Sequence, residues 1–230
     1  MRLMHEQSEK PLSGEEPAGD AEGEYSHFRC PKGEEGHSIL EHMNQHHREL
    51  TDWALSFLDG APASTALDIG CGGGMALSRI AALYPRAQLH GVDLSEEAIR
   101  CSAETNAEAM AEGRLYLQVA SVAELPFPDE RFDLVSAFET YFFWPNLEDS
   151  VAEACRTVAP GGTILIVSES YPNLFFRRIN ERNRRLYGVN VVENHQMKAM
   201  LEAAGMSVET KTKKLRNWVC FIGRKAVISS

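Results

Sequence analysis

The stretch 66-ALDIGCGGGMAL-77 predicts a strand, a glycine-rich turn and a helix in direct succession. Residues 65–69 form a short apolar run, and residues 75–83 have helical periodicity and stop before Pro85. Four glycines within the five positions 70–74 exceed what a tight turn requires. Glycine lets the backbone approach a ligand closely, and a helix N-terminus adds unpaired N–H groups. This turn is therefore expected to bind a ligand.

The segments that follow the turn alternate between apolar runs and helical patterns. Strands are expected at 88–92, 115–119, 133–137 and 163–167, and helices after Ser95, at 147–158 and at 194–204. Repeated β-α-β units indicate a Rossmann-like, doubly wound, mostly parallel sheet with helices on both faces. Residues 206–215 and 217–225 are expected to form two strands joined around Arg216.

The composition favours a cytoplasmic enzyme that handles a small molecule. The net charge of -10 counts against a nucleic-acid partner, because affinity for nucleic acid depends on Lys and Arg neutralising phosphates. No apolar run reaches the roughly 18 residues of a membrane span, so no membrane partner is expected. The five cysteines are odd in number and scattered, which indicates reduced thiols. A monomer or homodimer is expected.

The chain is expected to have three parts. Residues 1–36 are rich in Glu, Gly, Pro and Ser and are expected to be a mostly disordered acidic leader. Residues 37–62 are expected to form a capping helix, and residues 63–230 the main domain. A long connection near 170–193 resembles a lid. Its arginines either attract an anionic substrate or form a solvated helix face.

Two ligand classes compete for the glycine turn. A dinucleotide fingerprint, G-x-G-x-x-G, starting at Gly70 would need a glycine where Met75 stands. Asp93 ends the second strand, where a carboxylate can accept both hydroxyls of a ribose, but NAD and S-adenosylmethionine sites share that feature. The displaced glycine and the acid Asp68 before the turn favour a ligand without a pyrophosphate.

Four segments together resemble the successive motifs of class I S-adenosylmethionine-dependent methyltransferases, closest to the type 11 small-molecule branch. They are 67-LDIGCGGG-74, 91-GVDLS-95, 125-LPFPDERFDLV-135 and 159-APGG-162. The resemblance implies a seven-stranded sheet whose last two strands form an antiparallel hairpin. It also implies methyl transfer from S-adenosylmethionine to a small acceptor by in-line displacement, with S-adenosylhomocysteine as the second product.

The resemblance also implies which residues bind the cofactor. Near the methionine end it suggests Asp68, Gly70, Cys71 and Gly72, with Phe138 against the methionine chain. Asp93 is expected to bind the ribose, with Leu94 beside the adenine and Val122 packed on the ring. Many family members have an Asp that binds the adenine amino group; Ser121 stands in its place here.

The aromatic stretch 137-AFETYFFWPN-146 begins where the fourth strand is expected to end. Ligands of open α/β sheets bind beyond the carboxyl ends of strands, so we expect Glu139 and Tyr141 to face the methyl donor and the acceptor. Trp144 either lines the substrate pocket or packs in the core. The Asn/Asp-Pro-Pro-aromatic motif of DNA and glutamine amino-methyltransferases is absent, which counts against methylation of adenine or planar amides.

The N-terminal helix resembles the form M-N-x-x-H-x-x-L-x-x-W of close family relatives, in which it covers the cofactor. Asn44 and His47 lie one turn apart and could address the methionine carboxylate or the substrate. A general base is needed only if the acceptor must lose a proton. The candidates are Glu139, His47 and His195, in that order; Tyr141 is a further catalytic candidate, and His195 also a substrate contact.

His42 and His46 share a helix face at a spacing that metals use, but no third ligand stands at a suggestive distance in sequence. No metal is therefore predicted. Three other readings stay open: a catalytically silent S-adenosylmethionine binder, a NAD-dependent oxidoreductase and an arsenite-type methyltransferase. The five cysteines do not reproduce the pattern of the last class.

Overall fold

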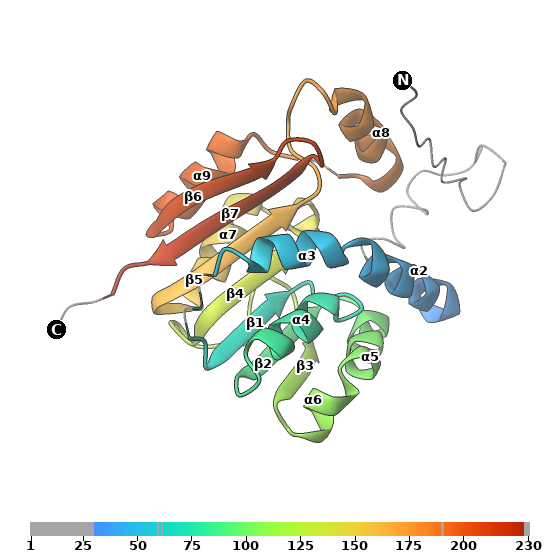
Figure 1. The fold of residues 1–230 in the computed structure, drawn as a ribbon, viewed down its shortest axis with the longest axis vertical. Helices are drawn as coiled ribbons and strands as arrows, with labels where there is room; N and C mark the ends of the chain where they lie inside the picture. The colour runs from blue at the N-terminus through green and yellow to red at the C-terminus, as the bar shows by residue number, and fades with distance from the viewer. Residues whose placement is uncertain (1–29, 59, 61, 190, 228–230) are drawn as a thin grey trace, which may run out of the picture.

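The computed structural model describes residues 30–58, 60, 62–189 and 191–227. One seven-stranded sheet runs through it in the order β3-β2-β1-β4-β5-β7-β6 (Figure 1). The strands are β1 Thr65–Ile69, β2 Gln88–Asp93, β3 Leu115–Val119, β4 Phe132–Phe138, β5 Val158–Ser168, β6 Met206–Lys213 and β7 Trp218–Lys225. Strands β1 to β5 pair in parallel, whereas β7 runs antiparallel to β5 and β6. The predicted fold class, with its C-terminal hairpin, is confirmed.

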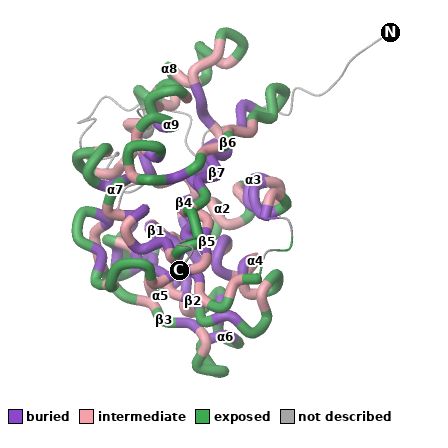
Figure 2. Tube along the Cα trace, turned by 90° about the vertical axis from the view of Figure 1, so that its left-hand side faces the viewer, coloured by how far each residue is buried: buried purple, intermediate pink, exposed green. Residues whose placement is uncertain are grey.

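Helices cover both faces of the sheet. They are α2 Gly33–His46, α3 Arg48–Leu55, α4 Met75–Leu83, α5 Glu96–Thr105, α6 Ala107–Ala111, α7 Leu147–Arg156, α8 Arg177–Tyr187 and α9 Asn194–Ala203, with a 3-10 turn η1 at Tyr141–Phe143. Side chains of α7 and α9 form one core with the sheet, and those of α3 and α4 form another. Figure 2 shows the buried segments gathered between these layers. No helix in the described part of the chain is long and apolar enough to cross a membrane.

The turn between β1 and α4 joins the ends of two neighbouring strands. Gly70 adopts a φ of +71°, and the N–H groups of Gly70 and Cys71 both donate to the Val92 carbonyl at the end of β2. At Gly91, a Cβ would lie 2.6 Å from a Leu117 methyl carbon, so β2 has no room for a side chain there. These constraints fix the turn against β2.

Two expected helices are interrupted in the structure. The N-terminal helix breaks at His47 into α2 and α3, and the helix after Ser95 breaks at Asn106 into α5 and α6. The Asn106 amide donates to the Gly74 and Ser102 carbonyls, which ties the second break to the glycine turn. The acidic leader is expected to extend to residue 36, but α2 begins at Gly33. Residues 1–29 lie outside the part of the chain that the structure describes.

The attachment of α3 to the sheet generates a stability prediction. Leu50 is 1% exposed in the core under α3, so Leu50→Ala should lower the free energy of unfolding by ~2–5 kcal/mol. The control Leu83→Ala, at a position that is 46% exposed, should change it by only about 0.5 kcal/mol. Urea unfolding measures both, and equal losses would contradict the packing described.

Candidate functional site

Two adjoining hollows lie at the carboxyl ends of the parallel strands. The first, of about 90 Å³, is enclosed by α2, the glycine turn and the end of β4, and the second, of about 50 Å³, by the ends of β2, β3 and β4. They share the lining residues Gly70, Asp93, Thr140 and Phe143. All nine residues that the sequence assigns to the cofactor line one or both: Asp68, Gly70, Cys71, Gly72, Asp93, Leu94, Ser121, Val122 and Phe138.

Asp93 connects β2 to the glycine turn. One carboxylate oxygen accepts the Gly72 N–H at 3.0 Å, and the other accepts the Ser95 N–H at 2.9 Å. Burial nevertheless raises the pKa of Asp93. An ionised carboxylate has about four acceptor positions, so Asp93 can still accept hydrogen bonds from a ligand.

Asp68 lies at the end of β1, where it is 1% exposed. Its carboxyl accepts a 2.7 Å hydrogen bond from the Ser136 hydroxyl on β4. Burial is the main cause that raises the pKa of Asp68, to about 7. The hydrogen bond from Ser136 lowers this pKa, and the nearby charge of Asp93 raises it by a smaller amount. Asp68 is thus a carboxyl that titrates near neutral pH at the floor of the first hollow. The Cys71 thiol beside it stays neutral, because burial raises its pKa.

Helix α2 covers the first hollow on the side opposite the sheet. The Asn44 amide donates to the Gly73 carbonyl at 2.8 Å, which holds α2 on the glycine turn. A Cβ at Gly73 would lie 2.5 Å from the Asn44 side chain, so the turn needs glycine for this close approach. Met43, Leu40 and His47 on the same side complete the cover. Asn44 therefore attaches α2 to the glycine turn and also lines the hollow, so the expected contact of Asn44 with a ligand stays a prediction.

Glu139 directly follows β4 in the left-handed conformation, with a φ of +55°. Such a φ is strained for a residue with a side chain and is common at functional sites. The Glu139 N–H donates to Val167 at 3.0 Å, and its carboxyl accepts the Glu169 N–H. Burial, and then the charge of Glu169, hold the pKa of Glu139 well above its ordinary value. Glu139 therefore presents a neutral carboxyl to the first hollow.

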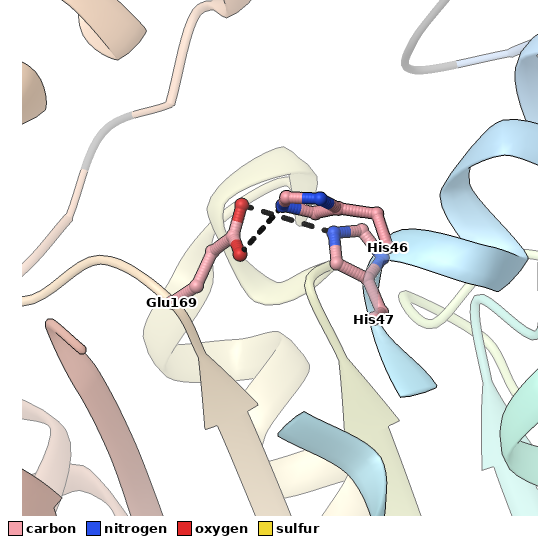
Figure 3. A group of neighbouring side chains, drawn as sticks. All are labelled: His46, His47 and Glu169. Carbon is pink, nitrogen blue, oxygen red and sulfur yellow. Dashed lines mark hydrogen bonds and ion pairs between the residues drawn. The ribbon is translucent and has the colours of Figure 1, made fainter. Parts of the chain in front are cut away.

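Glu169, the first residue after β5, faces two adjacent histidines, His46 and His47 (Figure 3). One of its oxygens is 3.1 Å from His46 Nε2, and the other is 3.8 Å from His47 Nε2. Burial by itself raises the pKa of Glu169, but its contacts with His46 and His47 lower that pKa to about 2. Of the two carboxyls, Glu169 therefore carries the negative charge and Glu139 the proton. Both Glu139 and His47 line the hollow.

The same three side chains form a group that could hold a metal ion. Their ligand atoms lie within 4.8 Å of one another, whereas bonds of about 2.1 Å in a tetrahedral shell place ligand atoms ~3.4 Å apart. Two of these separations, 3.1 Å from Glu169 to His46 and 3.8 Å from Glu169 to His47, are close to that value, so the group fits a metal ion as well as an ion pair. His42, which the sequence paired with His46, does not belong to it.

Two predicted residues lie outside both hollows. Tyr141 is 2% exposed in the core, where burial raises the pKa of its phenol. In a 3-10 turn residues i and i+3 share a side, so Thr140 and Phe143 face the hollows and Tyr141 does not. His195 is exposed on α9, whose buried side is formed by Met197 and Leu201. The expectation that Tyr141 faces the reacting groups is wrong; Trp144 lines the second hollow and also packs against the core.

The sequence reasoning missed three residues of the site. Thr140 and Phe143 line both hollows, and Glu169 holds His47. A signal for Glu169 is present in the sequence, because it lies two residues after the predicted parallel strand 163–167. Thr140 and Phe143 face the hollows because of a short 3-10 turn, and a turn of three residues leaves no hydrophobic periodicity in the sequence.

Comparisons with known proteins agree with this geometry. Residues 67–166 match the family described as a methyltransferase domain. The chain is 28% identical over 70% of its length to 27-O-demethylrifamycin SV methyltransferase of Amycolatopsis mediterranei, and 31% identical over 66% to a probable chloroplastic tocopherol O-methyltransferase of Oryza sativa subsp. japonica. It spans 60% and 43% of those two proteins.

The fold is similar to that of human N-acetylserotonin methyltransferase, solved in complex with S-adenosylmethionine. The TM-score is 0.66 at 17% identity, over 83% of this chain and 56% of that one. The motifs, the sheet order and the matched segment point to one family. Residues 67–166 of this chain match the methyltransferase-domain family, and the sheet order agrees with the class I fold that the motifs predict.

Proposed function

We propose that this protein transfers a methyl group from S-adenosylmethionine to a small molecule whose acceptor atom must lose a proton. The observation that carries the proposal is the first hollow. It combines the backbone of a glycine turn, a buried carboxyl on β1, a half-buried carboxyl on β2, and a histidine beside the charged Glu169. The relatives support the reaction class, since their names describe methyl transfer to small molecules.

The residues at the strand ends fit S-adenosylmethionine. Asp93 has free acceptor positions for ribose hydroxyls, and Leu94, Ser121 and Val122 line the hollow beyond it, where an adenine would lie. Asp68 can accept from the cationic amino group, whose charge favours the ionised carboxyl. When bound, the cofactor supplies an electrophilic methyl group on a sulfonium. A ligand that spans both hollows would contact Thr140 and Phe143, which line both.

His47 is the general base in this proposal. It lines the hollow and is 17% exposed, so an acceptor held against it is largely shielded from water. When His47 takes the acceptor proton, the ionised Glu169, with Oε1 3.8 Å from Nε2, stabilises the imidazolium. The neutral Glu139 can donate a hydrogen bond to the acceptor but cannot serve as the base while it is protonated. This reverses the order of candidates that the sequence suggested.

The acceptor class follows from the walls of the hollow. Met43, Phe138 and Phe143 supply apolar surface, and His47 supplies a proton acceptor. An apolar molecule with an acidic hydroxyl, such as a phenol or a quinol, suits both features. We further propose a cytoplasmic protein, which the five unpaired cysteines support, acting as a monomer or homodimer.

A transfer assay tests the function. The purified protein is incubated with S-adenosylmethionine labelled in the methyl group and a panel of phenols, quinols, amines and thiols. The proposal expects S-adenosylhomocysteine and a methylated phenol or quinol in equal amounts. Tight cofactor binding without transfer to any acceptor would favour the silent binder instead.

The role of His47 generates a kinetic prediction. His47→Asn should lower kcat near pH 7 by about 10²–10³-fold, the usual contribution of a general base. The deficit should shrink as pH rises, because the acceptor then ionises unaided, and affinity for S-adenosylhomocysteine should stay nearly unchanged. Rates measured across pH with a phenolic acceptor check this.

The matched control is His46→Asn, which removes the more exposed partner of the same carboxylate. Its kcat should fall by less than about fivefold, because an exposed ion pair contributes little energy. Dialysis against a chelator should leave the wild-type rate unchanged. An equal loss of kcat in both variants would contradict the role of His47 as the base. So would a rate that is restored only by a divalent cation, because the histidines would then bind a metal ion.

The raised pKa of Asp68 predicts how the stability of the ligand-free protein depends on pH. Its pKa is about 7 when folded and near 3.8 when exposed, so its protonation stabilises the fold fully below pH 3.8 and loses this effect as pH rises through 7. Asp68→Asn keeps an acceptor for Ser136 and removes the titration. The variant's stability relative to wild type should therefore rise by a few kcal/mol between about pH 4 and pH 7 and then level off. A constant difference in urea titrations would show that Asp68 is charged throughout.

A further inference from the structure

Helix α8 buries none of its described side chains. Its eleven residues include five arginines and one acid, Glu181, in a chain of net charge -10. The turn before it presents Leu174 and Phe175, which are 89% and 96% exposed. Packing of an apolar face normally stabilises a helix in a domain, and residues 177–185 of this helix, whose burial the structure describes, form no such face.

Asparagines attach α8 to the rest of the protein. The Asn180 amide donates to the Tyr171 carbonyl at 2.8 Å, and the Asn217 amide donates to Asn180 Oδ1 at 2.7 Å. Asn173 also donates to Asn217 Oδ1, at 2.5 Å. Asn217 is 3% exposed and its two asparagine partners are half-buried, so these contacts are partly shielded from water. They fix which side of α8 faces the body.

Helical spacing then determines the outward side. Arg177 and Arg184 lie one turn from Asn180, and with Glu181 they line a groove of about 460 Å³ whose other lining residues include Leu174, Val189 and Val191. Arg178, Arg182 and Arg185 share a different face and are all exposed. Ile179, three residues before Arg182, is 50% exposed beside them.

The turn between β6 and β7 continues the same surface. Asn217, which bonds α8, closes this turn with a φ of +59°. The turn presents Leu215 at 93% exposure, next to Lys214 and Arg216. Figure 1 shows α8 beside this turn, at the end of the sheet where β5 finishes. Leu174, Phe175 and Leu215 have the highest exposure among the large apolar side chains of the described residues.

We propose that residues 174–185 and the 213–217 turn form a docking surface for an anionic membrane. Protruding apolar side chains enter the boundary between lipid headgroups and acyl chains, while the arginines and Lys214 contact lipid phosphates. An acidic protein partner would also explain the cations, and the groove behind them is partly apolar through Leu174, Val189 and Val191. A membrane is favoured because Phe175 and Leu215 protrude outside that groove, beside exposed cations. The lack of a membrane-spanning run in the sequence does not bear on such surface binding.

The docking surface lies at the functional end of the sheet. Strand β6 runs parallel to β5, so the turn after β6, like Glu169 after β5, lies at the carboxyl ends of the strands. The hollows open at this same end. If the proposed methyl transfer is right, a membrane-soluble acceptor would reach them from the bilayer. The docking itself does not depend on that activity.

Vesicle flotation with the full-length protein tests the proposal. One set of vesicles contains phosphatidylcholine alone, and the other contains about a third phosphatidylglycerol, enough for a negative surface potential. Wild type should float with the anionic vesicles, and less so in high salt. Phe175→Ser with Leu215→Ser, and separately Arg178→Gln with Arg182→Gln, should each weaken binding by about tenfold or more.

The matched controls lie at the opposite end of the sheet. Val227→Ser follows β7 and is 72% exposed, and Arg86→Gln precedes β2. Both should float like wild type, and all variants should keep the wild-type melting temperature and affinity for S-adenosylhomocysteine. Equal binding to neutral vesicles, no binding, or equal losses in the controls would overturn the proposal. A change from dimer to monomer in the Phe175 variant without vesicle binding would assign the surface to a second copy instead.

Discussion

The site depends on one constraint, the joining of the glycine turn to the end of β2. Gly70 and Cys71 donate to the Val92 carbonyl, and Gly72 donates to the Asp93 carboxylate one residue later. The turn is thereby held open toward the hollows, and α2 can rest on it through Asn44. A backbone held in this way is prepared for a ligand before the ligand arrives, which lowers the entropy cost of binding.

The charges of the site follow from burial and pairing. Asp68 and Glu139 lie deep enough for burial to raise the pKa of each, whereas two histidines keep Glu169 ionised. Three carboxyl groups at or beside the first hollow thus differ in pKa, and Glu139 and Glu169 differ in protonation state. Such separation of pKa values is typical of sites that move protons, and it supports the assignment of the proton acceptor to His47.

The sequence predicts the sheet well, and the residues that it assigns to a cofactor lie together in the structure, because both depend on local patterns. Asp68, the glycines and Asp93 each end or follow a strand, and parallel strands bring their carboxyl ends together. Tyr141 was assigned wrongly because its direction is set by a short 3-10 turn after the strained Glu139. The break of α2 from α3, the contact of Glu169 with His47, and the exposure of α8 arise from tertiary packing, which no single segment encodes.

The central claim is that the hollows fit S-adenosylmethionine and not a dinucleotide. Calorimetric titration with S-adenosylhomocysteine and with NAD, on wild type and Asp93→Asn, tests it most directly, with Asp129→Asn, an exposed acid, as the control. The account predicts micromolar binding of S-adenosylhomocysteine by wild type and the control, at least about tenfold weaker in Asp93→Asn, since hydrogen bonds to a charged group contribute ~1.5–3 kcal/mol. Binding of NAD with no response to S-adenosylhomocysteine would contradict it.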